Sequence, residues 1–291
     1  MFSPAIILAA FLTLTPFLVE AFAPGILARL TGTLSMGIRL SLPVLLSIPY
    51  ALVALSTHTF HWAWLALYAA LPIAIAALMW RAKRFDPNRR GTWRDFAVLA
   101  TLGLAVDLRW FEPAWPPHLA VFNKMLLLDA GIYALLALRK IDGVGFDLRL
   151  RLRDLGIGLR EFAIYTPIAL ALGLALGFLH LHPFQTSPFK VATAYIFTFF
   201  FIAVPEELFF RGWLQNLLER RMGRLPSLAL TSALFGLSHW NKRAVHFNWG
   251  YVLLATIAGI FYGRAWRRQR RVGASAITHA TVDTVWSIWL R

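Results

Sequence analysis

Cysteine is absent from this chain of 291 residues. The absence excludes disulfide bonds, thiolate nucleophiles, thiolate metal ligands and palmitoylation. Any catalysis or metal binding must therefore use carboxylates, imidazoles or hydroxyl groups.

Charged residues are also scarce: they make up 15% of the chain, whereas hydrophobic residues make up 58%. A soluble domain usually has roughly 25% charged residues. The apolar residues fall in long blocks, and most blocks approach the roughly 20 residues that a helix needs to cross a bilayer. The sequence predicts an all-α fold, a polytopic transmembrane helix bundle of about ten spans (eight to ten). The predicted spans are Pro4–Phe22, Leu42–Leu55, Trp62–Trp80, Phe96–Val106, Leu119–Leu138, Glu161–Leu179, Phe189–Val204, Leu228–His239, Gly250–Trp266 and Gly273–Trp289.

Acidic residues are few, and the formal net charge is +15. Because the Arg residues sit at the ends of apolar blocks and do not form a basic face with stacking aromatics, nucleic acid is not expected as a partner. Arg-rich loops alternate with Arg-poor loops along the chain. We assign the Arg-rich loops to the cytoplasm, which places both termini outside and favours a bacterial cytoplasmic (inner) membrane. The first block lacks a basic leader and is interpreted as a span rather than a removed signal peptide.

The segment Asp147–Arg153 alternates apolar and basic residues. Taken alone, this period of two favours a β-strand. Between two predicted spans, it favours a segment on the cytoplasmic membrane surface, with Leu toward lipid and Arg toward anionic headgroups.

Two adjacent carboxylates lie deep in an apolar block. Glu206 is about 21 Å from the cytoplasmic edge marked by Arg220 and Arg221, at about 1.5 Å rise per residue. An ionisable residue in hydrocarbon costs at least about 2.5–3.5 kcal/mol on insertion scales, which makes it a functional candidate. Glu207 and Arg211 share a helix face as an i, i+4 pair, and Glu206 points about 100° away. An intrahelical ion pair therefore explains Glu207 and Arg211, but not Glu206.

Two histidines lie at comparable depth in later blocks. His239 follows Phe235 by one turn about 20 Å from the cytoplasmic side, and His279 lies about 12 Å deep with Asp283 at i, i+4. A lone His on an apolar helix is usually an interhelical hydrogen-bonding group. Three clusters at similar depth instead predict that separate helices converge around one water-accessible cavity. No matching polar or broken helix is expected in the first half of the chain.

These residue types can activate water. A carboxylate in a low-dielectric site can act as a general base, and an imidazole can hold the same water or donate to an oxyanion. Alternatively, Glu206, His239 and His279 could bind Zn²⁺ and leave the fourth position for water. A serine or threonine nucleophile has little support, since Ser238 points to another helix face than His239.

Three motifs resemble those of a known membrane protease family. Glu206-Glu207-Leu208-Phe209-Phe210-Arg211 is similar to E-E-x-x-x-R, Phe235-Gly236-Leu237-Ser238-His239 to F-x-x-x-H, and His279-Ala280-Thr281-Val282-Asp283 to H-x-x-x-N/D. In this order, the motifs resemble the CAAX-processing and bacteriocin-processing (CPBP) intramembrane proteases, and specifically the type II CAAX prenyl endopeptidase-like members. The resemblance covers roughly Leu155–Arg291.

The resemblance implies an intramembrane endopeptidase with an all-helical fold. Glu206 would be the base that activates water, and His239 would hold that water. Glu207 and Arg211 would be mainly structural, and His279 and Asp283 would shape the cavity, polarise the carbonyl or complete a metal site. Asp283 replaces the usual Asn, which adds negative charge, orients His279 and weakens a role as a neutral oxyanion donor. The expected substrate is a peptide or a membrane-protein segment, reached from the cytosolic leaflet.

The sequence therefore predicts two domains. Residues 1–145 form membrane helices without a motif, and residues 146–291 form the protease-like domain. Buried Glu, Arg, His and Asp also occur in proton relays, so a proton-coupled transporter is an alternative. A non-catalytic membrane scaffold of the same family is a second alternative, because fold does not fix function.

Overall fold

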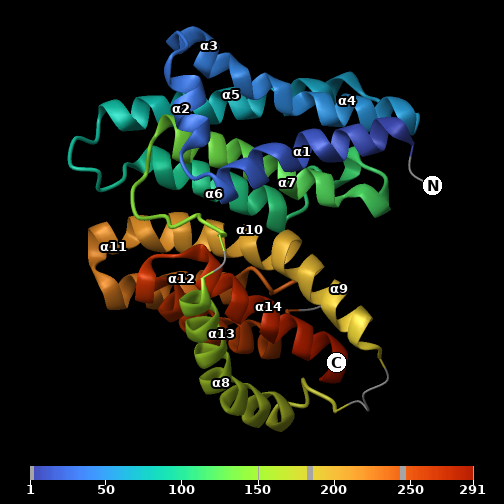
Figure 1. Cartoon of the computed structure of the whole chain (residues 1–291), viewed down its shortest axis with the longest axis vertical. Helices are drawn as coiled ribbons and strands as arrows, with labels where there is room; N and C mark the ends of the chain where they lie inside the picture. The colour runs from blue at the N-terminus through green and yellow to red at the C-terminus, as the bar shows by residue number, and fades with distance from the viewer. Residues whose placement is uncertain (1–2, 150, 182–185, 243–246, 291) are drawn as a thin grey trace. The chain divides into compact units, whose positions relative to one another are not determined.

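The structure is a computed structural model that describes residues 3–149, 151–181, 186–242 and 247–290. The regular structure of these residues is helical and includes no β-strand, which confirms the all-α prediction. The chain divides between Asp142 and Gly143 into two compact units, Met1–Asp142 (unit 1) and Gly143–Arg291 (unit 2). Figure 1 shows how the helices of each unit pack side by side.

Unit 1 contains long apolar helices and short helical connections. Its elements are α1 (Pro4–Phe22), α2 (Ile26–Gly32), α3 (Met36–Ser41), η1 (Leu42–Leu46), α4 (Ser47–Ser56), α5 (Trp62–Arg84), α6 (Trp93–Asp107), η2 (Glu112–Ala114), η3 (Pro117–Leu119), α7 (Val121–Gly131) and the π-helical η4 (Ile132–Leu138). Helix α7 forms the centre of the unit, because nearly all of its side chains are buried and it packs against α1, α5 and α6.

Local polar signals fix where the helices of unit 1 begin. The Ser3 hydroxyl accepts a hydrogen bond from the Ile6 amide at 3.3 Å and caps α1. Thr92 and Asp95 form a capping box at the start of α6. Such caps satisfy backbone amides that have no partner within the helix.

Arg139, directly after η4, holds together the cytoplasmic loops predicted for unit 1. Its side chain is buried, and its Nε donates to Asp95 Oδ1 at 2.7 Å. Arg139 also pairs with Asp86, whose carboxylate accepts from the amides of Arg90 and Gly91 at 2.9 and 2.8 Å. These bonds attach the loop between α5 and α6 to the end of η4.

Unit 1 also buries polar side chains, which the sequence analysis did not identify. The Glu20 carboxylate accepts a hydrogen bond from the Gly25 amide at 2.7 Å. The Tyr68 hydroxyl donates to Asn123 Oδ1 at 3.3 Å and accepts from Trp115 Nε1 at 2.6 Å. Sequence reasoning missed these groups because each stands alone among apolar neighbours, and only tertiary packing brings it to its partner.

Unit 2 consists of helices that surround α13. Its elements are α8 (Leu152–Ala175), α9 (Pro188–Thr198), the π-helical η5 (Phe199–Ala203), α10 (Val204–Glu207), the π-helical η6 (Leu208–Gln215), α11 (Asn216–Met222), α12 (Arg224–Leu237), α13 (Trp249–Gln269) and α14 (Val272–Trp289). Helices α8, α12 and α14 each pack against α13, and α9 and α10 pack against α14. The core of this bundle includes Tyr165, Phe235 and Tyr262.

Six helical segments of the described chain are long and apolar enough to cross a membrane. They are Pro4–Phe22, Met36–Ser56, Trp62–Arg84, Pro117–Leu138, Leu152–Ala175 and Pro188–Met222. The protein is therefore described as an integral membrane protein. Because α12, α13 and α14 are not among the six, the count of eight to ten spans stays a prediction.

The segment Asp147–Arg153 is not a strand where it is described. Helix α8 begins at Leu152, and the residues before it have no regular structure. Leu150 lies outside the described residues.

We predict that Arg139→Gln strongly destabilises the protein. The change leaves two buried carboxylates without their cation, and breaking a buried ion pair costs about 3–5 kcal/mol. The measurement is the midpoint of thermal unfolding in detergent. Arg89→Gln is the matched control, since the Arg89–Asp142 pair is exposed and such pairs contribute about 0–1 kcal/mol. Equal effects of the two substitutions would contradict the role of Arg139.

Candidate active site

One helical run, Pro188–Met222, carries the two adjacent glutamates through the unit. It is not a uniform α-helix: the π-helical segments η5 and η6 lie on either side of the short α10. Pro205 is the second residue of α10 and lies within this continuous run, where it removes one backbone hydrogen-bond donor. π-helical turns within long helices are frequent at functional sites, and here they flank Glu206 and Glu207.

Glu207 is the most densely bonded carboxylate of the site. It is fully buried and pairs with Arg211 Nη1 at 3.2 Å, the i, i+4 contact that the sequence predicted. It also accepts a hydrogen bond from the Ser275 hydroxyl and contacts His279 Nδ1 at 2.9 Å through Oε1. Because Ser275 and His279 both belong to α14, Glu207 joins α10 to α14.

Arg211 is buried with Glu207 and also bonds to α13. Its Nη2 donates to the Gly259 carbonyl at 3.0 Å. Its guanidinium carbon lies 4.6 Å from the centre of the Phe235 ring, within cation–π distance. Arg211, the cationic partner of Glu207, thus contacts both α12 and α13.

His279 stands between carboxylates on both ring nitrogens. Nδ1 faces Glu207, whereas Nε2 lies 3.5 Å from Asp283 Oδ2 and 3.9 Å from Glu206 Oε2. The Tyr262 ring stacks on the imidazole, with 4.6 Å between ring centres. Glu206 is 29% exposed, so it is accessible where the neighbouring Glu207 is not.

His239 approaches the same region from the end of α12. It lies two residues beyond Leu237, is buried, and its Nδ1 is 2.8 Å from the Phe235 carbonyl oxygen. The Phe235 ring lies between the two histidines, with its centre 4.9 Å from that of His239 and 5.6 Å from that of His279. Phe235, predicted as a supporting residue, thus spaces the two imidazoles.

The backbone of α12 comes close to α13 beside this pair. A Cβ on Gly236 would lie 1.9 Å from Thr256 Oγ1 and 2.6 Å from the Val252 carbonyl oxygen. Only glycine fits at this position without moving one helix away from the other.

A cavity of about 80 Å³ opens next to the histidines within unit 2. Its polar lining includes His239, His279 and Asp283, and the rest of its wall is largely aromatic and aliphatic. Most of the lining side chains come from α8, α12, α13 and α14, and Phe178 follows the end of α8. The lining includes Phe162, Tyr165, Phe178, Tyr251, Leu254, Tyr262 and Trp286. The space could accept a small number of apolar groups or ordered water molecules beside the imidazoles.

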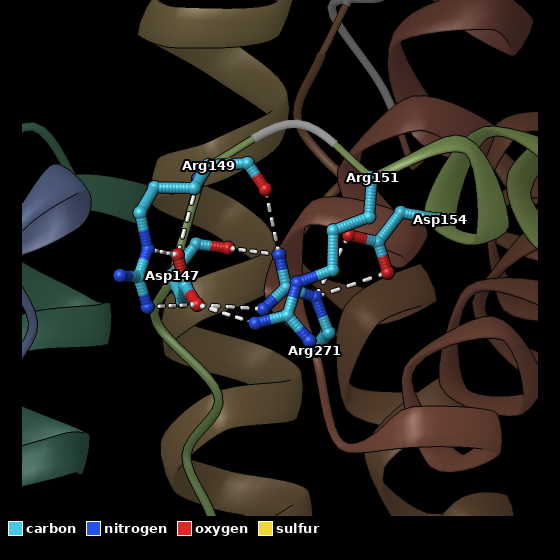
Figure 2. Close-up of polar contacts among 5 residues, drawn as sticks. All are labelled: Asp147, Arg149, Arg151, Asp154 and Arg271. Atoms are coloured by element: carbon cyan, nitrogen blue, oxygen red, sulfur yellow. Dashed lines mark hydrogen bonds and ion pairs between the residues drawn. The ribbon is translucent and has the colours of Figure 1, made fainter.

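Arg271 fixes the start of α14, and Figure 2 shows its contacts. Its side chain is buried and donates to Asp154 Oδ2 at 2.7 Å and to Asp147 Oδ2 at 2.8 Å. It also donates to the Asp147 and Arg149 carbonyls at 2.9 Å each. Because α14 carries Ser275, His279 and Asp283, this cluster helps to set their position.

The described residues do not form a metal-ligand set as they are placed. No group of three or more His, Asp or Glu side chains among them has the geometry to hold a metal ion. His279 Nδ1 faces Glu207, and His239 Nδ1 faces a backbone carbonyl, which leaves Nε2 as the ring nitrogen that could bind a metal in each case. Zn²⁺ binding by Glu206, His239 and His279 therefore stays a prediction.

The structure thus brings the carboxylates of Glu206, Glu207 and Asp283 close to the imidazole of His279. The ring of Phe235 contacts both His279 and His239. Sequence reasoning missed Ser275, Tyr262 and Gly259, which contact Glu207, His279 and Arg211. Ser275 lies one turn before His279 on the same face of α14, a spacing that could have identified it. Tyr262 and Gly259 lie on a helix without a motif and carried no such signal.

Comparison with known proteins gives one match. Residues 187–285 match the family model described as type II CAAX prenyl endopeptidase Rce1-like. The match spans all three motifs and confirms the resemblance found in the sequence. No curated protein sequence and no solved structure matches the chain.

We predict that Asp147 stabilises unit 2 in a pH-dependent way. The Arg149 guanidinium holds the pKa of the Asp147 carboxyl well below its usual range; burial opposes this shift and Arg271 adds to it. A carboxyl with a lowered pKa stabilises the fold above its unfolded-state value of about 3.9, and this contribution is lost as the pH falls further.

The measurement is the unfolding midpoint of the wild type and Asp147→Asn between pH 7 and pH 3. We expect the wild type to be more stable at pH 7 and the difference to shrink below about pH 4. The exposed Asp142→Asn is the control. A difference that stays constant across this range would contradict the ionised cluster.

Proposed function

We propose that this chain is an intramembrane endopeptidase that uses Glu206 to activate water. The match of residues 187–285 to the family model of Rce1-like type II CAAX prenyl endopeptidases supports this proposal. The observation that carries this assignment is the difference between the two adjacent glutamates. Glu207 is fully buried and bonded to Arg211, Ser275 and His279, whereas Glu206 is 29% exposed beside His279. Glu206 is thus the carboxylate that water can reach.

In the proposed reaction, Glu206 takes a proton from a water molecule as that water attacks the peptide carbonyl. The proton then passes to the leaving nitrogen, and the products are a carboxylate and an amine. General base catalysis by a positioned carboxylate contributes typically about 10²–10⁴-fold. His239 would hold the attacking water from the cavity side.

His279 is the group that can stabilise the oxyanion in this proposal. Carboxylates lie within 4 Å of both of its ring nitrogens, at 2.9 Å from Glu207, 3.5 Å from Asp283 and 3.9 Å from Glu206. In this proposal the ring is in its imidazolium form, which donates from both nitrogens. Nε2 would then donate to the carbonyl oxygen, and Asp283 would orient the ring.

The substrate that we propose is a peptide or a segment of a membrane protein. The cavity wall is largely apolar, with aromatic side chains such as Tyr251 and Trp286, and therefore suits an apolar substrate segment. The distribution of Arg between loops supports access from the cytosolic leaflet of a bacterial inner membrane, with both termini outside. We also propose that α12, α13 and α14 complete a bundle of eight to ten spans.

We predict that Glu206→Gln and His239→Ala each lower cleavage by at least about 100-fold, because each removes a group that acts on the water. The protein is reconstituted in liposomes with a pool of membrane peptides, and mass spectrometry counts the new peptide termini. Glu112→Gln is the matched control: Glu112 is also 29% exposed but belongs to unit 1. Undiminished cleavage by folded Glu206→Gln would reject the proposed base. No cleavage by the wild type would favour the scaffold alternative.

We predict that Glu207→Gln lowers the stability of the protein more than Glu206→Gln does. The change leaves Arg211 buried without the carboxylate of Glu207, which costs about 3–5 kcal/mol, whereas Glu206 is 29% exposed and its substitution leaves the Glu207–Arg211 pair in place. The measurement is the free energy of unfolding in mixed micelles for both variants. If Glu207→Gln were as stable as the wild type, Glu207 would not have the structural role assigned to it.

A further inference from the structure

Most buried acidic side chains of the described residues have a visible partner. Glu20 accepts from the Gly25 amide, Asp95 binds Arg139, and Asp154 binds Arg271. Glu161 lies 3.0 Å from Arg264 Nε, and Glu207 binds Arg211. Each of these carboxylates therefore has a cation or a backbone amide to compensate its burial.

Asp129 departs from this rule. It lies on α7, the central helix of unit 1, and is 1% exposed. Neither of its carboxylate oxygens has a hydrogen-bond partner in the described chain. A buried polar group without a partner requires a specific explanation, such as bound water, an ion or a functional role.

Asp129 is also placed well inside the membrane. Its span, Pro117–Leu138, is the most deeply buried of the six, with 72% of its apolar window buried. The carboxyl lies nine residues before the end of η4 at Leu138, which is about 13 Å along the helix at about 1.5 Å per residue. The π-helical segment η4 begins three residues after Asp129, and such segments are frequent at functional sites.

The titratable groups on the elements around α7 are engaged elsewhere or lie at helix ends. On α1, Glu20 binds the Gly25 amide; on α5, Tyr68 bonds to Asn123; on α6, Asp95 binds Arg139. On η4, Tyr133 donates to the Arg39 carbonyl at 2.7 Å. The remaining charged groups of these elements are Arg81, Lys83 and Arg84 at the end of α5, Arg94 and Asp107 at the two ends of α6, and the exposed Lys124 on α7. η1 has no titratable side chain.

One further polar group lies on a helix that packs against α7. Thr13 is on the buried face of α1, and its hydroxyl likewise has no hydrogen-bond partner in the described residues. Asp129 and Thr13 together give the interior of unit 1 two polar positions that could hold a proton or a water molecule.

We propose that Asp129 is a proton-binding site in the membrane interior of unit 1, separate from the peptidase site of unit 2. An ionised carboxylate without a partner in hydrocarbon is far more costly than the neutral acid. The ligand of this site is therefore the proton, and it is held on a carboxyl that no cation neutralises. The sequence motifs assign no function to unit 1. Under this proposal, unit 1 binds a proton at Asp129.

The test uses dicyclohexylcarbodiimide, an apolar reagent that reacts with protonated carboxyls within membranes. The acid proton moves to a carbodiimide nitrogen, and the carboxylate oxygen bonds to the central carbon to give an O-acylisourea. This adduct rearranges to an N-acylurea without a leaving group, so the protein gains the mass of one whole reagent. The full-length protein in nanodiscs is treated, and the modified residue is located by peptide mass spectrometry.

We expect modification at Asp129 at least ten-fold faster than at Asp95 or Glu20, whose carboxylate oxygens accept hydrogen bonds from Arg139 and from the Gly25 amide. The rate should fall as the pH rises, and Asp129→Asn should lose this adduct while any adduct at Glu206 remains. Labelling of Asp95 with none at Asp129 would overturn the proposal. Loss of the Asp129 adduct does not affect peptide cleavage, so this test is independent of the proposed function.

A second measurement applies even if the reagent cannot reach the site. Asparagine mimics the neutral acid, so Asp129→Asn should unfold within a few degrees of the wild type at pH 6. At alkaline pH the wild type should become the less stable of the two, because it loses its proton in a site without a cation. Asp95→Asn is the matched control on α6 and should be destabilised already at pH 6, since it leaves Arg139 with one carboxylate fewer. A large destabilisation of Asp129→Asn at pH 6 would reject the neutral acid.

Discussion

Glu207 is a carboxylate in the membrane interior that has no contact with solvent. The packing of the site depends on the groups that compensate the buried charge of Glu207. Arg211 supplies the opposite charge from one turn further along the same run of helix, while Ser275 and His279 reach it from α14. A buried charge left without partners would cost several kcal/mol, so α10, η6 and α14 can pack only in the arrangement that satisfies it. That requirement fixes the depth of α14 and, with it, the positions of His279 and Asp283.

The same constraint extends to the other two helices of the site. Arg211 donates to the Gly259 carbonyl on α13 and lies over the ring of Phe235 on α12. Phe235 in turn separates His239 from His279, and Gly236 allows α12 to approach α13 closely. In the proposed reaction, the accessible Glu206 is the base, whereas the buried Glu207 makes the contacts between helices. Arg271, anchored on Asp147 and Asp154, fixes the start of α14.

The sequence predicted the parts of this arrangement that depend on spacing along a single helix. The i, i+4 pairing of Glu207 with Arg211 and the closeness of His279 to Asp283 follow from helical geometry, and the three motifs gave the resemblance that the family model over residues 187–285 supports. Contacts between helices could not be predicted in this way. Tyr262, Gly259 and the partners of Glu20 and Asn123 become visible only through packing, and Asp129 was missed because no polar residue accompanies it in the sequence.

The coupling between Glu207 and His279 is the interaction on which the account depends, and a double-mutant cycle measures it directly. The free energy of unfolding is compared for the wild type, Glu207→Gln, His279→Gln and the double variant. Residues that share a buried hydrogen bond show coupling of about 0.5–3 kcal/mol, whereas independent sites are additive within about 0.3–0.5 kcal/mol. We predict a coupling of at least about 1 kcal/mol that stabilises the pair, in line with a buried, charge-assisted hydrogen bond. Additive effects would contradict the claim that Glu207 holds α14 in place through His279.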